Sequence, residues 1–158
     1  MSMNTNASGE DERKNTIGDL GQFVELWTSI YNTGGKPDWS HILPYYSDNI
    51  YFEDTIQKIR GIKDFSSMVD RLTKRSKELR FRIINSLMEG NIIFMEWEMT
   101  ISFRGTKSSA IRGASRIKLD ETGKISEQRD YYDLWGDIYD NIPLLNRLYR
   151  AFMRKVFG

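Results

Sequence analysis

The chain has 158 residues, a formal net charge of +1, no cysteine and a single histidine. This length suits one domain with a sizeable core. The balanced charge provides no overall field for nucleic acid, so we expect no nucleic-acid partner. Without cysteine the chain has no disulfides or thiolate metal ligands, which is compatible with a cytoplasmic location. His41 stands alone and is expected to be structural, so we expect no metal and no redox cofactor.

Residues 1–15 are polar and contain no apolar run, which predicts a disordered leader rather than a signal peptide or membrane anchor. From Thr16 to about Tyr31, apolar residues recur every three or four positions and predict an amphipathic helix. A short helix is expected from Trp39 to about Tyr46, followed by a turn at 47–49 and a strand at 50–53. Another amphipathic helix is expected from Gly61 to about Lys77.

Alternating apolar and polar residues then predict three strands, at 79–88, 92–103 and 109–119, with turns at 89–91 and 104–106. The middle strand has an apolar face made of Ile93, Met95, Trp97, Met99, Ile101 and Phe103. Such a pattern predicts an α+β fold, in which a curved antiparallel sheet is covered on its apolar face by the preceding helices.

The turn Asp120–Gly123 leads into a last strand that contains candidate functional side chains. Its alternation places Ser126, Gln128, Asp130 and Tyr132 on one face and Ile125, Glu127, Arg129 and Tyr131 on the other. Because neither face is plainly apolar, this strand indicates a pocket rather than a simple core.

An extension, residues 134–158, ends in a basic amphipathic helix at 143–158. One face carries Leu144, Leu145, Leu148, Tyr149, Phe152, Met153, Val156 and Phe157, and the other carries Arg147, Arg150, Arg154 and Lys155. The favoured interpretation is that this helix docks on the body or closes the mouth of the pocket. The alternative is a helix that binds a membrane surface or a partner.

The order of helices and strands over residues 16–133 resembles the nuclear transport factor 2-like superfamily, a cone-shaped α+β barrel with one pocket. Tyr51-Phe-Glu-Asp54, followed by Gly61 at the start of a helix, resembles the segment that supplies the general base in ketosteroid isomerases. Gly123-Lys-Ile125 leading into Arg129-Asp-Tyr-Tyr-Asp133 is similar to the end of limonene-epoxide hydrolase and of SnoaL-like polyketide cyclases. There the first aspartate is catalytic, so the resemblance implies a catalytic role for Asp130.

The sequence also departs from these relatives. Ser115 stands where ketosteroid isomerases place an acidic oxyanion donor, and Trp27 stands where they place a tyrosine. Trp97 and Met99 occupy the positions of the arginine and aspartate of the epoxide hydrolases. A SnoaL-like domain, in which a single inward aspartate often acts as acid and base, is therefore the closest functional label.

Two carboxylates are the candidate catalytic groups, Asp130 and Asp54. An apolar surrounding would remove water from them and raise their proton affinity. Structural roles remain open, since Asp54 can form a turn and Asp130 can pair with Arg112 or Arg129. Alternation places Arg112 outward, but a bulge at Gly113 would swing it into the pocket. The candidate pocket residues are Trp27, Tyr31, Tyr46, Phe52, Trp97, Met99, Arg112, Ser115 and Tyr132.

Three functions remain open. The first is a cofactor-independent isomerase, cyclase or hydrolase that uses the pocket aspartates on a hydrophobic carbonyl compound. The second is a non-catalytic binder of a small apolar molecule. The third is a dimerisation module, with a homodimer formed through charged residues on the outer sheet face: Arg80, Arg82, Glu96, Glu98, Arg116 and Lys118.

Overall fold

The computed structural model describes residues 15–103, 108–138 and 143–158. The expected leader, apart from Asn15, and the turn expected at 104–106 therefore lie outside the described residues. The elements follow in the order α2 (Leu20–Tyr31), η1 (Leu43–Tyr45), β1 (Tyr46–Glu53), β2 (Lys58–Arg60), α3 (Ile62–Arg75), β3 (Ser76–Glu89), β4 (Ile92–Phe103), β5 (Ser109–Leu119), β6 (Ile125–Tyr132), η2 (Leu134–Ile138) and α4 (Pro143–Phe157).

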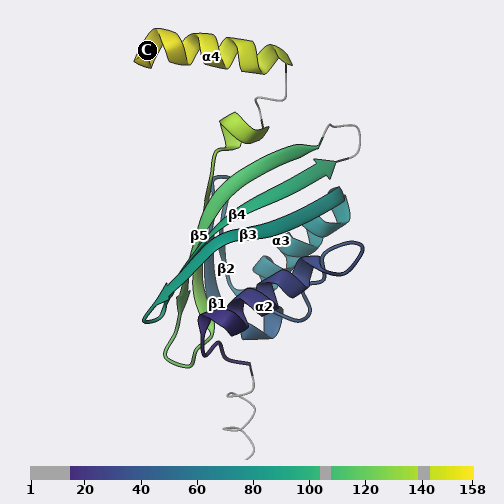
Figure 1. Cartoon of the computed structure of the whole chain (residues 1–158), viewed down its shortest axis with the longest axis vertical. Coiled ribbons are helices and arrows are strands. Elements are labelled where there is room, and N and C mark those ends of the chain that lie inside the picture. Colours follow the sequence, from purple (N-terminus) through teal and green to yellow (C-terminus); the bar gives the residue numbers. More distant parts are fainter. Residues whose placement is uncertain (1–14, 104–107, 139–142) are drawn as a thin grey trace, which may run out of the picture.

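The six strands form one curved sheet in the order β2-β1-β6-β5-β4-β3, and α2 and α3 cover its concave face (Figure 1). The predicted α+β fold is confirmed. One feature differs from the expected antiparallel sheet, because β1 and β6 pair in parallel. A parallel pair brings the carboxyl ends of both strands to the same edge of the sheet. This edge proves important for the site.

Helix α2 starts later than the sequence pattern suggested, because Asp19 caps it. Its carboxylate accepts a hydrogen bond from the Gln22 amide at 2.9 Å, and the Gln22 side chain accepts one from the Gly18 amide at 2.8 Å. This reciprocal pair satisfies amides that a helix end leaves without partners. Helix α3 follows Gly61, whose φ of 88° lies in the left-handed region that glycine tolerates best.

The segment between α2 and α3 was predicted least well. The helix expected from Trp39 to Tyr46 is only a short 3-10 turn, and the turn expected at 47–49 lies inside β1. Parallel pairing with β6 extends β1 back to Tyr46. A register shift between Tyr46 and Tyr51 accommodates the polar residues 47–49 within the strand. Strand β2 was not predicted, since three residues are too few to show an alternating pattern. Helix α3 ends at Arg75, and β3 begins directly at Ser76.

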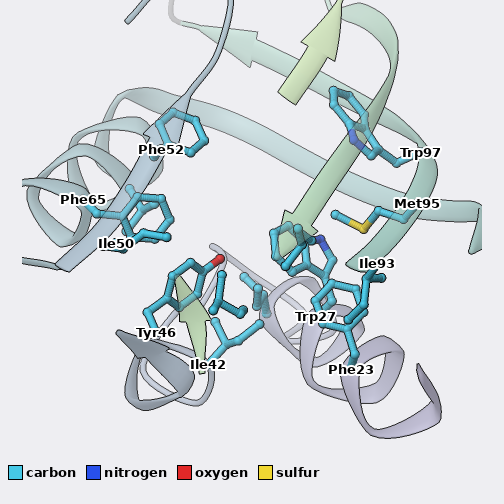
Figure 2. Close-up of a cluster of buried hydrophobic side chains, with 14 of the residues drawn as sticks. Phe23, Trp27, Ile42, Tyr46, Ile50, Phe52, Phe65, Ile93, Met95 and Trp97 are labelled. Atoms are coloured by element: carbon cyan, nitrogen blue, oxygen red, sulfur yellow. The ribbon is translucent and has the colours of Figure 1, made fainter. Parts of the chain in front are cut away.

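The core lies between the concave face of the sheet and the helices. Ile93, Met95, Trp97 and Ile101 of β4 are buried, as predicted, and Figure 2 shows Phe23 and Trp27 of α2 beside Ile93. The side chain of Phe103, which was expected on the same face, lies outside the described residues.

Gly113 has a steric role rather than the bulge considered from the sequence. The pairing of β4 with β5 runs without a shift from Ile101↔Ser109 to Ile92↔Lys118, through Trp97↔Gly113. A Cβ at Gly113 would lie 2.5 Å from Trp97 Cζ2 and 2.6 Å from the Tyr131 carbonyl oxygen. Glycine is therefore needed here to make room for the Trp97 indole.

The predicted docking of the C-terminal helix on the body or across the pocket is wrong. In Figure 1, α4 lies beyond the end of the sheet. Leu144, Leu148 and Phe152 on its apolar face are exposed. The Tyr149 ring does stack on Trp135 of η2, with a centroid separation of 4.9 Å.

Candidate active site

A cavity of about 380 Å³ lies between the concave face of the sheet and helices α2 and α3. Its walls are mostly apolar and aromatic. They include Trp27, Tyr31, Trp39, Phe52, Phe65, Met68, Val69, Leu72, Phe81, Trp97, Met99, Ile101, Ile111 and Tyr132. Two carboxylates, Asp54 and Asp130, lie among them. A largely apolar cavity with a few polar groups is the usual form of a small-molecule site.

Asp130 is held by uncharged hydrogen-bond donors. Its Oδ1 accepts a bond from the Ser115 hydroxyl at 2.6 Å and one from Gln128 Nε2 at 3.1 Å. Its Oδ2 accepts only the longer contact from Gln128 at 3.3 Å among the bonds described. The strand alternation that placed Asp130, Gln128 and Tyr132 on one face therefore predicted the orientation of this carboxylate.

Ser115 and Gln128 are themselves positioned by hydrogen bonds from other residues. The indole Nε1 of Trp97 donates to the Ser115 hydroxyl at 2.9 Å, and the Tyr46 hydroxyl donates to Gln128 Oε1 at 2.8 Å. Ser115 and Gln128 are buried. The Ser115 hydroxyl and the Gln128 side-chain oxygen therefore each accept a hydrogen bond from another residue, which fixes the direction in which Ser115 and Gln128 donate to Asp130.

Neither of the arginine pairings considered for Asp130 is formed. Arg112 Nε contacts Glu98 Oε2 at 3.2 Å on the outer face, and Arg129 contacts Glu53 at 3.5 Å. In the described part of the chain, no lysine or arginine forms an ion pair with Asp130. The inclusion of Arg112 among the pocket residues was wrong, because the regular register keeps it outward.

The environment of Asp130 raises the pKa of its carboxyl group to about 6. Burial is the main cause, and the negative charge of Asp54 adds to it, while the hydrogen bonds from Ser115 and Gln128 oppose the shift. At neutral pH the group is thus mainly ionised but close to its titration point. A base with a pKa near the working pH is well suited to take up and return a proton.

The raised pKa predicts a pH-dependent loss of stability. The native state holds the Asp130 proton up to about pH 6, whereas the unfolded chain releases it near 3.8. The free energy of unfolding of the wild type, relative to Asp130→Asn, should therefore fall by about 2 kcal/mol between roughly pH 4.5 and 7.5. Urea unfolding at both pH values measures this difference. Asp48→Asn, which removes an exposed carboxylate from β1, serves as the control. A difference that does not change with pH would show that Asp130 is not desolvated.

Removing the Ser115 hydroxyl should raise the pKa of Asp130 further. That hydroxyl gives the shortest bond to the carboxylate and stabilises its ionised form. A carboxylate-resolved NMR titration of Ser115→Ala measures the change. Ser126→Ala is a matched control, because its hydroxyl bonds to the Lys118 carbonyl instead. An unchanged titration of Asp130 in Ser115→Ala would contradict the assigned bond.

Asp54 forms a turn and also lines the cavity. Its Oδ1 accepts bonds from the Ile56 and Gln57 amides at 2.8 and 2.7 Å, which forms a turn after β1. Its Oδ2 accepts a bond from the Tyr132 hydroxyl at 3.3 Å. Burial, together with Asp54, raises the pKa of Tyr132. Both aspartates line the same cavity, and the parallel pairing of β1 with β6 brings them together.

Most of the predicted pocket residues are brought together. Trp27, Tyr31, Phe52, Trp97, Met99, Ser115 and Tyr132 line the cavity. Tyr46 is buried beneath it and bonds to Gln128. Gln128 was not predicted as a site residue. Its position on the same strand face as Asp130 was the feature of the sequence that indicated this role. Phe65, Met68 and Leu72 of α3 also line the cavity, whereas the sequence predicted only an amphipathic helix there. Arg71 and Arg75 of α3 were not predicted to line the cavity.

No group of three or more potential metal-ligating side chains is found in residues 15–103, 108–138 and 143–158. His41 lies on the surface, with its Nε2 atom 3.4 Å from Asp38 Oδ2.

Comparisons with known proteins bear on the family. No curated protein matches the chain. Among solved structures, a hypothetical protein with a ketosteroid isomerase-like fold from Catenulispora acidiphila, in complex with trimethylamine, has a TM-score of 0.67 and 13% identity over 81% of this chain and 98% of its own. A LEH-like epoxide hydrolase of Mycobacterium tuberculosis has a TM-score of 0.60 and 19% identity over 85% and 94%. An NTF2-like protein of unknown function from Burkholderia pseudomallei has a TM-score of 0.64 and 10% identity over 74% and 92%. At these identities the similarity shows the fold.

The family itself is shown by the sequence. The model of the SnoaL-like domain matches residues 22–128, which is more than half of the chain and includes Asp54, Ser115 and Gln128. The chain belongs to the SnoaL-like domain family.

Proposed function

We propose that this protein is an acid–base enzyme that acts on a small hydrophobic carbonyl compound, with Asp130 as the proton-transfer group. The observation that supports this most is Asp130 itself, a carboxylate in an apolar cavity, bonded only to neutral donors and with a pKa of about 6. Structural ion pairing does not explain its position. A desolvated carboxylate in a cavity is a common feature of catalytic sites.

In the proposed step, Asp130 takes a proton from the carbon beside the substrate carbonyl. The electrons of the broken C–H bond form the enolate C=C bond, and the carbonyl π electrons move to oxygen. Ser115 holds Oδ1, so Oδ2 is the oxygen that approaches the substrate. If a C=C bond is conjugated with the enolate, return of the proton from Asp130 to its far carbon gives an isomer. If the enolate carbon attacks a second carbonyl, the π electrons of that carbonyl move to its oxygen, Asp130 returns the proton there, and a cyclised product results.

The developing oxyanion needs a hydrogen-bond donor. Burial raises the pKa of both Tyr31 and Tyr132, so both hydroxyls remain protonated at neutral pH. Both line the cavity. The Tyr132 hydroxyl already donates its one proton to Asp54, so we propose that Tyr31 donates to the substrate oxygen. Fixed donors in a water-poor site stabilise such charge strongly.

The apolar walls also favour a second candidate, a protein that binds a small apolar molecule without changing it. The complex of the Catenulispora acidiphila neighbour with trimethylamine supports small-molecule binding in this fold. In that case the walls select the ligand and Asp130 contributes polarity alone.

Deuterium exchange separates the two candidates without knowledge of the natural substrate. A panel of hydrophobic ketones and β-diketones is incubated with the protein in D2O, and label at the carbon beside the carbonyl is followed by NMR. Enzyme-dependent exchange that is lost in Asp130→Asn supports the proposal. Compounds that shift cavity resonances but show no enzyme-dependent exchange would favour the binding protein. Exchange that continues in Asp130→Asn would remove Asp130 from the mechanism.

A further inference from the structure

Helix α4 carries an apolar surface that the protein leaves uncovered. Leu144 is 73% exposed, and Leu148, Phe152 and Val156, which follow it at intervals of four residues, are more than half exposed. The helix lies off the end of the sheet in Figure 1. Exposed large apolar residues that gather on one side of one helix are unusual for a protein surface and indicate an interaction site.

The opposite side of the same helix is strongly basic. At 3.6 residues per turn, Arg147, Arg150 and Arg154 lie within a narrow stripe that faces away from Leu145 and Phe152. Residues 143–158 contain four basic residues and no acidic one, in a chain whose net charge is only +1. This separation of an apolar face from a basic face is typical of helices that lie in a membrane interface.

We propose that α4 binds the surface of a bilayer that contains anionic lipids. The apolar face would enter the boundary between headgroups and acyl chains, while the arginine stripe, together with Lys155, attracts the negative surface. Trp135, which is exposed and stacks on Tyr149, adds an aromatic ring of the kind favoured at that boundary. Pairing of α4 with α4 from a second copy is disfavoured, because contact through the apolar faces would bring Lys155, which lies between Leu144 and Leu148 on the helix, into both sides of the interface and would leave the arginine stripe without a negative partner.

The length of the helix decides between lying on a membrane and crossing it. With 15 residues, α4 is about 22 Å long, shorter than the roughly 30 Å hydrocarbon core. Among the described residues, no helix has the length and apolar character needed to cross a bilayer.

The position of α4 relates the membrane to the cavity. β1 and β6 run parallel, so their carboxyl ends lie at one edge of the sheet, where the Thr55 hydroxyl donates to the Tyr132 carbonyl at 3.3 Å. Ile56, which lines the cavity and is 66% exposed, follows β1 at that edge, and η2 and α4 follow β6. A bilayer bound to α4 would therefore lie at the same edge of the sheet as Ile56, an exposed residue of the cavity wall.

The test is co-sedimentation of the full chain with vesicles of phosphatidylcholine alone or with about 30% phosphatidylglycerol. Each basic residue near an anionic surface contributes roughly fivefold in partitioning. Arg147→Gln/Arg154→Gln/Lys155→Gln should therefore reduce binding to the anionic vesicles by about a hundredfold. Lys63→Gln/Lys74→Gln/Lys77→Gln removes the same charge from exposed positions on the body and should bind nearly as wild type.

Leu148→Ser/Phe152→Ser tests the apolar face in the same assay. These side chains are exposed, so the thermal midpoint should not change, while vesicle binding should be lost at both lipid compositions. Failure of the wild type to bind anionic vesicles would overturn the proposal. An equal loss of vesicle binding in the α4 charge variant and in the Lys63→Gln/Lys74→Gln/Lys77→Gln control would also overturn it. A wild-type dimer that Leu148→Ser/Phe152→Ser dissociates would assign the face to a second copy instead. Vesicle binding is measured without turnover, so its outcome does not depend on the proposed acid–base chemistry.

Discussion

Asp130→Asn should reduce enzyme-dependent exchange of a ketone substrate by about 10²- to 10⁴-fold while the fold is kept. Asparagine has nearly the same shape as aspartate and can still accept the bond from Ser115, which is 2.6 Å from Oδ1. It cannot take up a proton, and loss of a positioned general base has an effect of this size. The exchange rate at a fixed concentration of ketone measures the loss.

The pH dependence gives an independent check on the same residue. The pKa of Asp130 is about 6, and the ionised form is the base, so kcat/KM should rise with pH below 6 and level off above it. In Ser115→Ala the midpoint should move to higher pH, because the bond that favours the ionised form is lost. Asp48→Asn should leave both the rate and the midpoint unchanged. A wild-type profile that is flat between roughly pH 5 and 8 would argue against Asp130 as the base.

Gly113→Ala should destabilise the protein by about 3 kcal/mol, at the upper end of the usual range for overpacking. The new methyl group would lie 2.5 Å from the Trp97 ring and 2.6 Å from the Tyr131 carbonyl oxygen. The ring can tilt, but the carbonyl belongs to β6 and cannot move without disturbing the sheet. Urea unfolding measures the loss of stability.

The same substitution should disturb the Asp130 carboxylate. Tilting of Trp97 lengthens its 2.9 Å bond to Ser115, which in turn holds Asp130. Gly35→Ala is the matched control, because an added Cβ there has no atom within 4 Å and the backbone does not need a positive φ. Gly113→Ala with the stability of the wild type would show that β5 and β6 are not packed as closely as the structure has them.

Sequence patterns alone are sufficient to predict the elements whose residues follow one regular period over many positions. The alternation in β4 predicted its buried face at Ile93, Met95 and Trp97, and the alternation in β6 predicted that Asp130 and Tyr132 share the inner face. The spacing of apolar residues in α3 predicted an amphipathic helix in the same way. Such periods reflect local geometry, in which side chains two or 3.6 residues apart must share an environment, so they can be recognised before the chain is folded.

Contacts between residues far apart in the sequence could not be predicted and depend on the folded sheet. The parallel pairing of β1 with β6 turned 47–49 into strand and brought Asp54 beside Tyr132, a contact across 78 residues that no local pattern encodes. The bond from Ser115 to Asp130 and the outward position of Arg112 depend on the register between strands. Register is set by the packing of the whole sheet, and at Gly113 by the space that one indole ring needs, so the chemistry of the site could be located from the sequence but its geometry could not.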